Sequence, residues 1–339
     1  MNVVIALLPV LLMLALLQLM DSFKLVRITS VLTAIAAGAL AAILCLTVQA
    51  WLIDASGVNL WVFERYVSPI TEEALKASLV AAVLWQGRVG FLVDAAVLGF
   101  GVGAGFALVE NVDYLRHLVD APVALWLVRG FGTAVLHGAT TAVFAMVSKT
   151  LVDRSSDRRW LTLVPGLAVA IAIHSAFNHL PLPPLAMTAA VLLLLPLLVV
   201  VVFQRSERAT REWVGAGLDL DIELLDLVRS EHFASTRFGH YLQELRARFS
   251  GLVLADMFCL LRLELELSVQ AKAMLLARDA GLDVPASEDL RASLQEIAYL
   301  QTTIGRTGLL ALRPLQVTSD RDRWHRYLLG GTSKEFLGF

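Results

Sequence analysis

The first 204 residues contain seven apolar stretches of the length that crosses a lipid bilayer, and this feature limits the fold more than any other. A membrane-crossing helix needs about 20 mostly apolar residues. Because backbone polar groups cannot stay unpaired in lipid, such stretches predict helices. The first stretch has no basic residue before it and no small-residue cleavage site after it, so we expect a span rather than a signal peptide. The predicted spans are about 3–20, 28–53, 69–86, 90–115, 124–148, 160–180 and 183–203.

Composition supports a membrane protein and excludes two other classes. Hydrophobic residues make up 57% of the chain and charged residues 17%, below the roughly 25% charge of soluble domains. A net charge of -2 and the lack of a basic run argue against nucleic acid as a partner. Cys45 and Cys259 lie in apolar or helical patterns, so neither a disulfide framework nor a thiolate metal site is indicated.

The pattern changes after Phe203, where most of the charged residues lie. Apolar residues there recur at three- and four-residue spacing, which is typical of amphipathic helices that pack on one another. A break at Gly281–Pro285 and an N-cap at Ser287 precede the last predicted helix. We predict an all-α fold: a polytopic membrane helix bundle at 1–204, a soluble helical domain at 205–315 and a tail at 316–339.

Basic residues that flank the spans predict the orientation, because cytoplasmic loops carry an excess of Lys and Arg. Arg65 and Arg116 fall on one side of a seven-span arrangement, and ten other basic residues fall on the opposite side: Lys24, Arg27, Arg88, Lys149, Arg154, Arg158, Arg159, Arg205, Arg208 and Arg211. The N-terminus is therefore expected outside and the C-terminus in the cytoplasm.

Several ionisable residues lie in or at the edge of the predicted spans, where each costs up to about 2.5–3.5 kcal/mol on insertion scales. Such residues normally face the bundle interior and mark function. They are Glu72, Glu73, Lys76, Asp94, Glu110, Asp113, Arg129, His137 and His174.

Glu72, Glu73 and Lys76 begin the span in "SPITEEALKASLVAAVLWQG". At about 100° per residue, Lys76 lies angularly between the two glutamates, one turn further in. Two interpretations remain open on these residues alone. They form a structural ion pair at the mouth of a span, or one glutamate is a general base that the lysine keeps ionised in a dry setting.

"LGFGVGAGFALVENVDYL" lies in a span and lacks the strand and ribose-binding acid of a dinucleotide site. Its glycines have instead the small-xxx-small spacing that lets another helix approach closely. Glu110 and Asn111 lie near the outer end of this span.

His174 and Asn178, four residues apart in "AIHSAFNHL", share one helix face; His179 is expected at the interface. His137 lies deeper, amid small residues. In the predicted topology Glu72, Glu73, Glu110, His174 and Asn178 all fall toward the outer face, which favours one active site over scattered ion pairs.

These motifs, taken in order, resemble the PrsW family of intramembrane proteases. The resemblance covers roughly residues 65–180. The same skeleton of glutamates and histidines is similar, more distantly, to that of the CAAX-processing endopeptidases and bacteriocin-immunity proteins. It is carried by Glu72-Glu73-x-x-Lys76, Gly105-Phe106 leading to Glu110-Asn111, His137, and His174-x-x-Phe177-Asn178.

The resemblance implies hydrolysis of a peptide bond in a single-span protein within the bilayer, in a bacterial plasma membrane. It implies Glu72 as the base that activates water, with Glu73 orienting or sharing the proton. Oxyanion or water positioning falls to His137, His174 and Asn178, and a supporting role to Lys76, Glu110 and Asn111. Characterised members make the first cut in a membrane-anchored anti-sigma factor. The partner of the C-terminal domain is left open.

Metal dependence and activity itself are also left open at this point. The family is described as metal-dependent, and two histidines with a glutamate supply three zinc ligands. Without an H-E-x-x-H motif, a mechanism with no cofactor is the expectation. The rival classes are a proton- or cation-coupled transporter and an inactive immunity or scaffold protein. No internal repeat of the transporter kind is visible, and the absence of a lysine in 183–203 argues against a photoreceptor.

Overall fold

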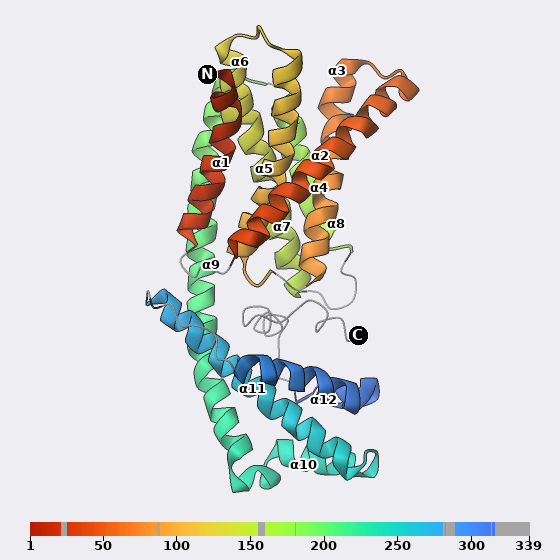
Figure 1. Ribbon diagram of the computed structural model, residues 1–339, viewed down its shortest axis with the longest axis vertical. Coiled ribbons are helices and arrows are strands. Elements are labelled where there is room, and N and C mark those ends of the chain that lie inside the picture. Colours follow the sequence, from red (N-terminus) through yellow and green to blue (C-terminus); the bar gives the residue numbers. More distant parts are fainter. Residues whose placement is uncertain are drawn as a thin grey trace. The chain divides into compact units, whose positions relative to one another are not determined.

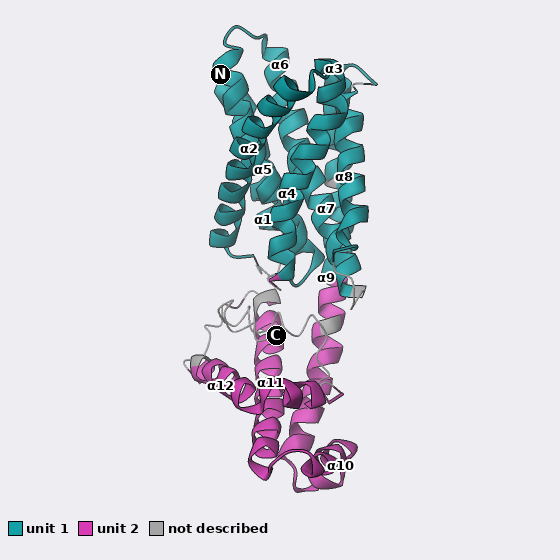
Figure 2. Cartoon of the chain, turned by 90° about the vertical axis from the view of Figure 1, so that its right-hand side faces the viewer, with its two compact units in different colours: residues 1–85, 89–207 teal, residues 86–88, 208–339 magenta. Residues whose placement is uncertain are grey.

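The computed structural model describes residues 1–21, 26–86, 89–154, 160–179, 181–280, 282, 289–312 and 314–315. All regular structure in these ranges is helical (Figure 1). The chain divides into two compact units (Figure 2). The first unit comprises residues 1–85 and 89–207. The second unit comprises the residues from Arg208 onward, together with Gln86. The basic residues Lys24, Arg88, Arg158 and Arg159, the break at Gly281–Pro285, Ser287 and the tail 316–339 lie outside the described residues.

Helices occupy all seven predicted spans, which confirms the helical membrane bundle. Five helices are long and apolar enough to cross a membrane by length and composition. They are α1 (Asn2–Met20), α2 (Ile28–Ser56), α5 (Leu92–His117), the continuous helix of α6 (Val123–Leu127), η2 (Val128–Ala134) and α7 (Val135–Arg154), and α9 (Pro184–Arg229).

The other two predicted spans fall on shorter or more polar helices. α8 (Leu163–Asn178) has 16 residues, and α4 (Ser68–Trp85) has 18 residues that include Glu72, Glu73 and Lys76. α4 continues without a break from α3 (Leu60–Val62) and η1 (Phe63–Val67). The segments η1 and η2 are π-helical turns, which occur mostly as single turns and frequently at functional sites.

α5 lies inside the first unit and is buried along most of its length. Its glycines create this position, because they let two neighbouring backbones approach. A Cβ atom on Gly103 would lie 2.2 Å from the carbonyl oxygen of His137 in α7, and one on Gly105 would lie 2.0 Å from that of Ile35 in α2. The small-xxx-small prediction is confirmed, and the close contact sets how near His137 comes to α5.

Large apolar side chains remain exposed on the outer helices of the first unit, among them Leu12, Leu40 and Leu193. In a bilayer these side chains face lipid, which is as apolar as they are. The protein is an integral membrane protein.

The described part of the second unit is helical. Beyond the C-terminal part of α9 its helices are η3 (Glu231–Ser235), α10 (Arg237–Glu244), η4 (Leu245–Ala247), α11 (Gly251–Asp279) and α12 (Asp289–Leu312). Lys272 on α11 bonds Asp221 on α9 at 2.6 Å, and Ser268 donates to the same carboxylate. That this unit is a cytoplasmic domain remains a prediction.

Candidate active site

Glu73 is the most extensively bonded carboxylate in the first unit. Its Oε1 atom accepts hydrogen bonds from Lys76 Nζ at 2.7 Å and from Thr140 Oγ1 at 3.1 Å. His174 Nδ1 lies 2.9 Å from the same oxygen. Glu73 and Lys76 are 1% and 0% exposed, so the charge on each must be balanced by the other. Three helices, α4, α7 and α8, therefore meet at one oxygen atom.

His174 lies on α8, and one of its two ring nitrogens, Nδ1, is bonded to Glu73. Because the Glu73 carboxylate only accepts hydrogen bonds, the proton of the neutral ring resides on Nδ1. Nε2 then carries the lone pair, and it lies 3.9 Å from Glu72 Oε2. The ring is oriented toward Glu72 by the carboxylate behind it.

His137 enters from α7 in the matching arrangement. Its Nε2 lies 2.8 Å from Glu110 Oε2 and its Nδ1 lies 3.0 Å from Lys76 Nζ. An ammonium group only donates, so Nδ1 holds the lone pair and Nε2–H donates to Glu110. Nδ1 is also 3.7 Å from Glu72 Oε2.

The two oxygens of Glu72 have different surroundings. Oε1 accepts hydrogen bonds from Ser68 Oγ at 2.5 Å and from Gln49 Nε2 at 3.2 Å. Oε2 is buried and has no hydrogen-bond partner among the described residues. A buried carboxylate oxygen without a donor is costly, so this atom is available to a bound ion, a water molecule or a substrate.

Glu72, His137 and His174 form a group that suits a metal ion. One ligand atom from each lies within 4.8 Å of the others. Both imidazoles have a carboxylate behind the ring, which is the arrangement that orients metal-binding histidines. Three protein ligands with an open fourth position are typical of catalytic zinc sites. The residues therefore fit a divalent cation, although Lys76 Nζ lies against the His137 lone pair that such an ion needs.

The fixed charges of the cluster also favour a cation. Three carboxylates face two cationic side chains: Glu72, Glu73 and Glu110 against Lys76 and Arg129. The cluster therefore carries an excess negative charge at low dielectric unless a proton or a cation is added.

A second set of contacts supports Glu110 at the same oxygen that faces His137. Arg129, on η2, lies 3.3 Å from Glu110 Oε2 and donates from Nε to Asn111 Oδ1 at 2.9 Å. Its guanidinium lies 3.5 Å from the ring centroid of Tyr114. Asn111 Nδ2 in turn donates to the carbonyl oxygen of Ala6 at 2.7 Å. Asn111 thus ties α1 and η2 to α5, and its contact with the cluster among the described residues is through Arg129.

The structure does not bring Asn178 into the cluster. Its Nδ2 donates to the carbonyl oxygen of Glu64 at 2.9 Å, which ties the end of α8 to η1. Asn178 shares a helix face with His174, as its spacing predicts, but it lies one turn further along that face. His179, predicted at the interface, is half-buried against Trp61 and Tyr66.

Four residues that touch this network were not assigned a role from the sequence. Ser68, four residues before Glu72, and Thr140, three after His137, stand at helical spacing from assigned residues, and this signal was available. Arg129 was noted as a charge in a span. Gln49 gave no signal, because it is a single polar residue near the end of an apolar helix.

Asp94, another ionisable residue in a span, lies at the start of α5. Its Oδ2 accepts hydrogen bonds from the backbone N–H groups of Gly90 and Phe91. This is a helix-capping role.

The fold and the site together define a membrane-embedded hydrolase with a buried Glu/His centre. Residues 22–204 match the PrsW family of intramembrane metalloproteases, and the chain belongs to this family. It is thus a peptidase that acts within the membrane, which displaces the transporter interpretation. Neither the curated proteins nor the solved structures contain a match to the chain.

Proposed function

We propose that the chain is an endopeptidase that cleaves single-span membrane proteins near the outer face of a bacterial plasma membrane. The observation that carries this proposal is the Glu72 carboxylate, with one oxygen fixed and the other buried, unpartnered and faced by two imidazole nitrogens. A peptide carbonyl and a water molecule brought to this oxygen would meet a base and two orienting groups at once. The outer location follows from the predicted topology.

We further propose that Glu72, His137 and His174 hold a divalent metal ion. Such an ion, when bound, supplies Lewis acidity to the scissile carbonyl and makes water nucleophilic near neutral pH. The side chains around the three ligands hold them in place. Glu73 and Glu110 orient the imidazole rings, and Ser68 orients Glu72 through Oε1. The carboxylate behind each histidine supports this choice over the metal-free mechanism that the sequence favoured.

A second mechanism is favoured by one specific contact, that of Lys76 Nζ with His137 Nδ1 at 3.0 Å. In it no metal is bound. Glu72 Oε2 takes the proton from the attacking water and later gives it to the leaving amine, while His174, carrying a second proton on Nε2, donates to the developing oxyanion. Asn178 was expected to assist the oxyanion, but its amide nitrogen is engaged with Glu64.

The test uses the full chain in proteoliposomes with membrane proteins of the cell that makes it. Wild type is compared with Glu72→Gln, His137→Ala and His174→Ala, and new protein termini are identified by mass spectrometry. Termini close to membrane segments that appear only with wild type support the proposal. Proteolysis that persists in all three variants would reject the site, and its absence with wild type would reject the function. Metal analysis and chelation then separate the two mechanisms: a stoichiometric ion with chelator-sensitive cleavage supports the first.

The substrate class proposed by analogy with the family is a membrane-anchored anti-sigma factor that loses its outer part in a first cut. An outward-facing centre suits this role. The expected result is release of the outer domain of such a protein, with the new terminus at the outer end of its span. A cut on the cytoplasmic side would contradict both the orientation and the substrate class. The second unit, proposed as a cytoplasmic domain, is open to a protein partner.

A further inference from the structure

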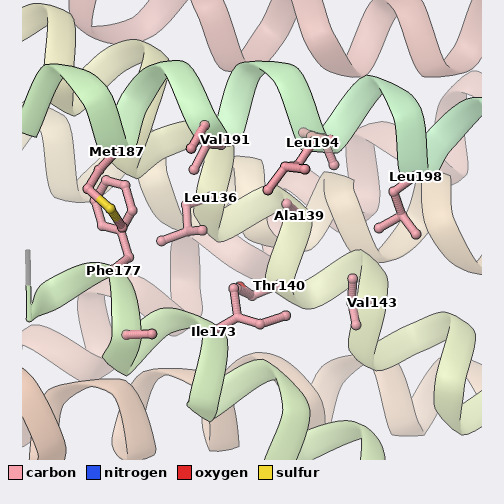
Figure 3. Close-up of a pocket in the computed structure, with 13 residues that line it drawn as sticks. Leu136, Ala139, Thr140, Val143, Ile173, Phe177, Met187, Val191, Leu194 and Leu198 are labelled. Atoms are coloured by element: carbon pink, nitrogen blue, oxygen red, sulfur yellow. The ribbon is translucent and has the colours of Figure 1, made fainter. Parts of the chain in front are cut away.

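An apolar pocket of about 410 Å³ lies between α7, α8 and α9 in the first unit (Figure 3). Figure 3 shows side chains from these three helices directed toward a common space. Among the described residues that line it, Thr140 provides the one polar side chain. The lining is Leu136, Ala139, Thr140, Val143, Ile173, Ala176, Phe177, Met187, Ala190, Val191, Leu194, Leu195 and Leu198.

Thr140 connects this pocket to the Glu/His centre. Its side chain lines the pocket, while its hydroxyl donates to Glu73 Oε1 at 3.1 Å. Leu136 and Ile173, which also line the pocket, directly precede His137 and His174 in the chain. The pocket therefore adjoins the centre along its α7 side, between Leu136 and Val143.

The pocket is elongated along the helices. On α9 its lining runs from Met187 to Leu198, which at 1.5 Å per residue corresponds to about 16 Å. On α7 it runs from Leu136 to Val143, so Val143 marks the direction away from His137. This length and the volume of about 410 Å³ suit several apolar side chains of one segment rather than a single side chain.

Part of the lining is also exposed to the surroundings of the bundle. Ile173 on α8 and Leu194 on α9 are 39% and 63% exposed, and in a bilayer this surface meets lipid. An occupant can thus enter sideways from the membrane, between α8 and α9, without crossing water. Within the described lining no charged group is present to hold a polar ligand or an ion.

We infer that this pocket receives the apolar membrane segment of the substrate. The inference rests on the proposed function. The bond to be cut lies beside Thr140, and the apolar residues on the inner side of that bond lie along α9 toward Leu198. A cut near the outer face then leaves the remaining membrane segment seated in the pocket. The apolar lining and the access from lipid suit a peptide segment or a lipid acyl chain, and the link to the centre through Thr140 favours the peptide segment, because the centre is proposed to act on a peptide bond.

Two adjacent alanines on α9 provide a matched test. Ala190 lines the pocket, whereas Ala189 is exposed and does not line it. A photoreactive benzoylphenylalanine is placed at either position in the Glu72→Gln background, which prevents cleavage. The reconstituted protein is irradiated with a biotinylated synthetic peptide that has one Leu/Ala membrane segment of about 20 residues.

We expect position 190 to crosslink the peptide at least fivefold more than position 189, and the peptide to displace lipid crosslinks at 190. Crosslinks to lipid alone at 190, or equal peptide crosslinking at both positions, would overturn the inference. Because this readout needs no catalysis, it is separable from the proposed function. Peptide capture at 190 without any cleavage by wild type would retain the pocket and reject the function.

Cleavage kinetics provide the second measurement, on a substrate identified from the membrane proteins. Ala190→Trp fills the pocket and should lower kcat/KM at least tenfold, mainly through KM, while Ala189→Trp should leave it within twofold. Glu72-dependent cleavage that is unaffected by Ala190→Trp would overturn the pocket and leave the protease intact. Monodispersity of both tryptophan variants in detergent confirms that they are folded.

Discussion

His174 Nδ1 lies 2.9 Å from Glu73 Oε1, and this contact leaves Nε2 of the same ring facing Glu72. The two adjacent glutamates therefore have different surroundings. Glu73 Oε1 is contacted by Lys76, Thr140 and His174, whereas Glu72 Oε2 has no hydrogen-bond partner among the described residues. In the proposed mechanism Glu72 is the reactive residue, and Glu73 is a positioning residue that acts through His174.

Glu72→Gln should lower kcat/KM by at least about 100-fold, in line with the contribution of a positioned acid–base group. The amide keeps the volume and can still accept from Ser68, so the fold should persist. Cleavage of a membrane-anchored substrate in proteoliposomes measures the effect. Glu64→Gln, an exposed acid at the start of the same helical run, is the control and should be neutral. Equal losses in both variants would contradict the assignment.

Glu73→Gln should weaken zinc binding by about 10–100-fold, which is the usual cost of losing the group behind a metal-binding histidine. Glu73 supplies no ligand in the proposed site, so affinity should fall without a change in stoichiometry. Zinc titration of the purified protein with a competing chelator measures this. The exposed Asp54→Asn variant should bind as wild type does. Unchanged zinc affinity in Glu73→Gln would show that the ion is not held by His174 in the proposed site.

Lys76→Met should destabilise the protein by about 3–5 kcal/mol, because it leaves Glu73 as a buried charge without its cation. The double variant Lys76→Met with Glu73→Gln removes both charges and should recover a large part of this loss. Unfolding of the detergent-solubilised protein, followed for both single variants and the pair, gives the coupling energy. Additive losses would show that the 2.7 Å contact contributes little.

Gly103→Ala should separate α5 from α7, since the new Cβ would meet the His137 carbonyl oxygen at 2.2 Å. Overpacking of this kind costs about 1–3 kcal/mol and should also displace His137 and reduce activity. Gly101→Ala is the matched control on the same helix, because its Cβ would meet the Ala34 methyl group at 3.2 Å and the Val31 carbonyl oxygen at 3.7 Å, both far less close. The ratio of their unfolding midpoints and cleavage rates checks this prediction, and equal effects would contradict it.

Much of the fold was predictable, because lipid forces the backbone into helices wherever the sequence is apolar for long enough. The charges in α4 were equally informative, since a buried Glu73 and Lys76 need partners, and the predicted topology put Glu110 and His174 at the same outer depth with His137 somewhat deeper. The short α8 and the course of α9 through both units were not predictable, because helix ends in this chain do not coincide with the ends of its apolar stretches.

The geometry of the site was only partly predictable. Helical spacing placed His174 and Asn178 on one face, but the rotation of α8 about its axis and its depth depend on packing against α4 and η1. Those contacts take Asn178 to Glu64 and His174 to Glu73. Residue spacing within α4 also does not predict which oxygen of Glu72 accepts hydrogen bonds, because one of the donors, Gln49, lies on a different helix.

The π-helical turns at Phe63–Val67 and Val128–Ala134 affect how relatives of this chain are to be compared with it. A π turn closes bonds between residues five apart and therefore takes up one more residue than an α turn. A relative that lacks this extra residue would keep Glu72 and His137 in register while everything upstream on the same helix shifts by one position, or by about 100°. Arg129, inside the second turn, would be mismatched by an ungapped alignment even where its contact with Glu110 is preserved.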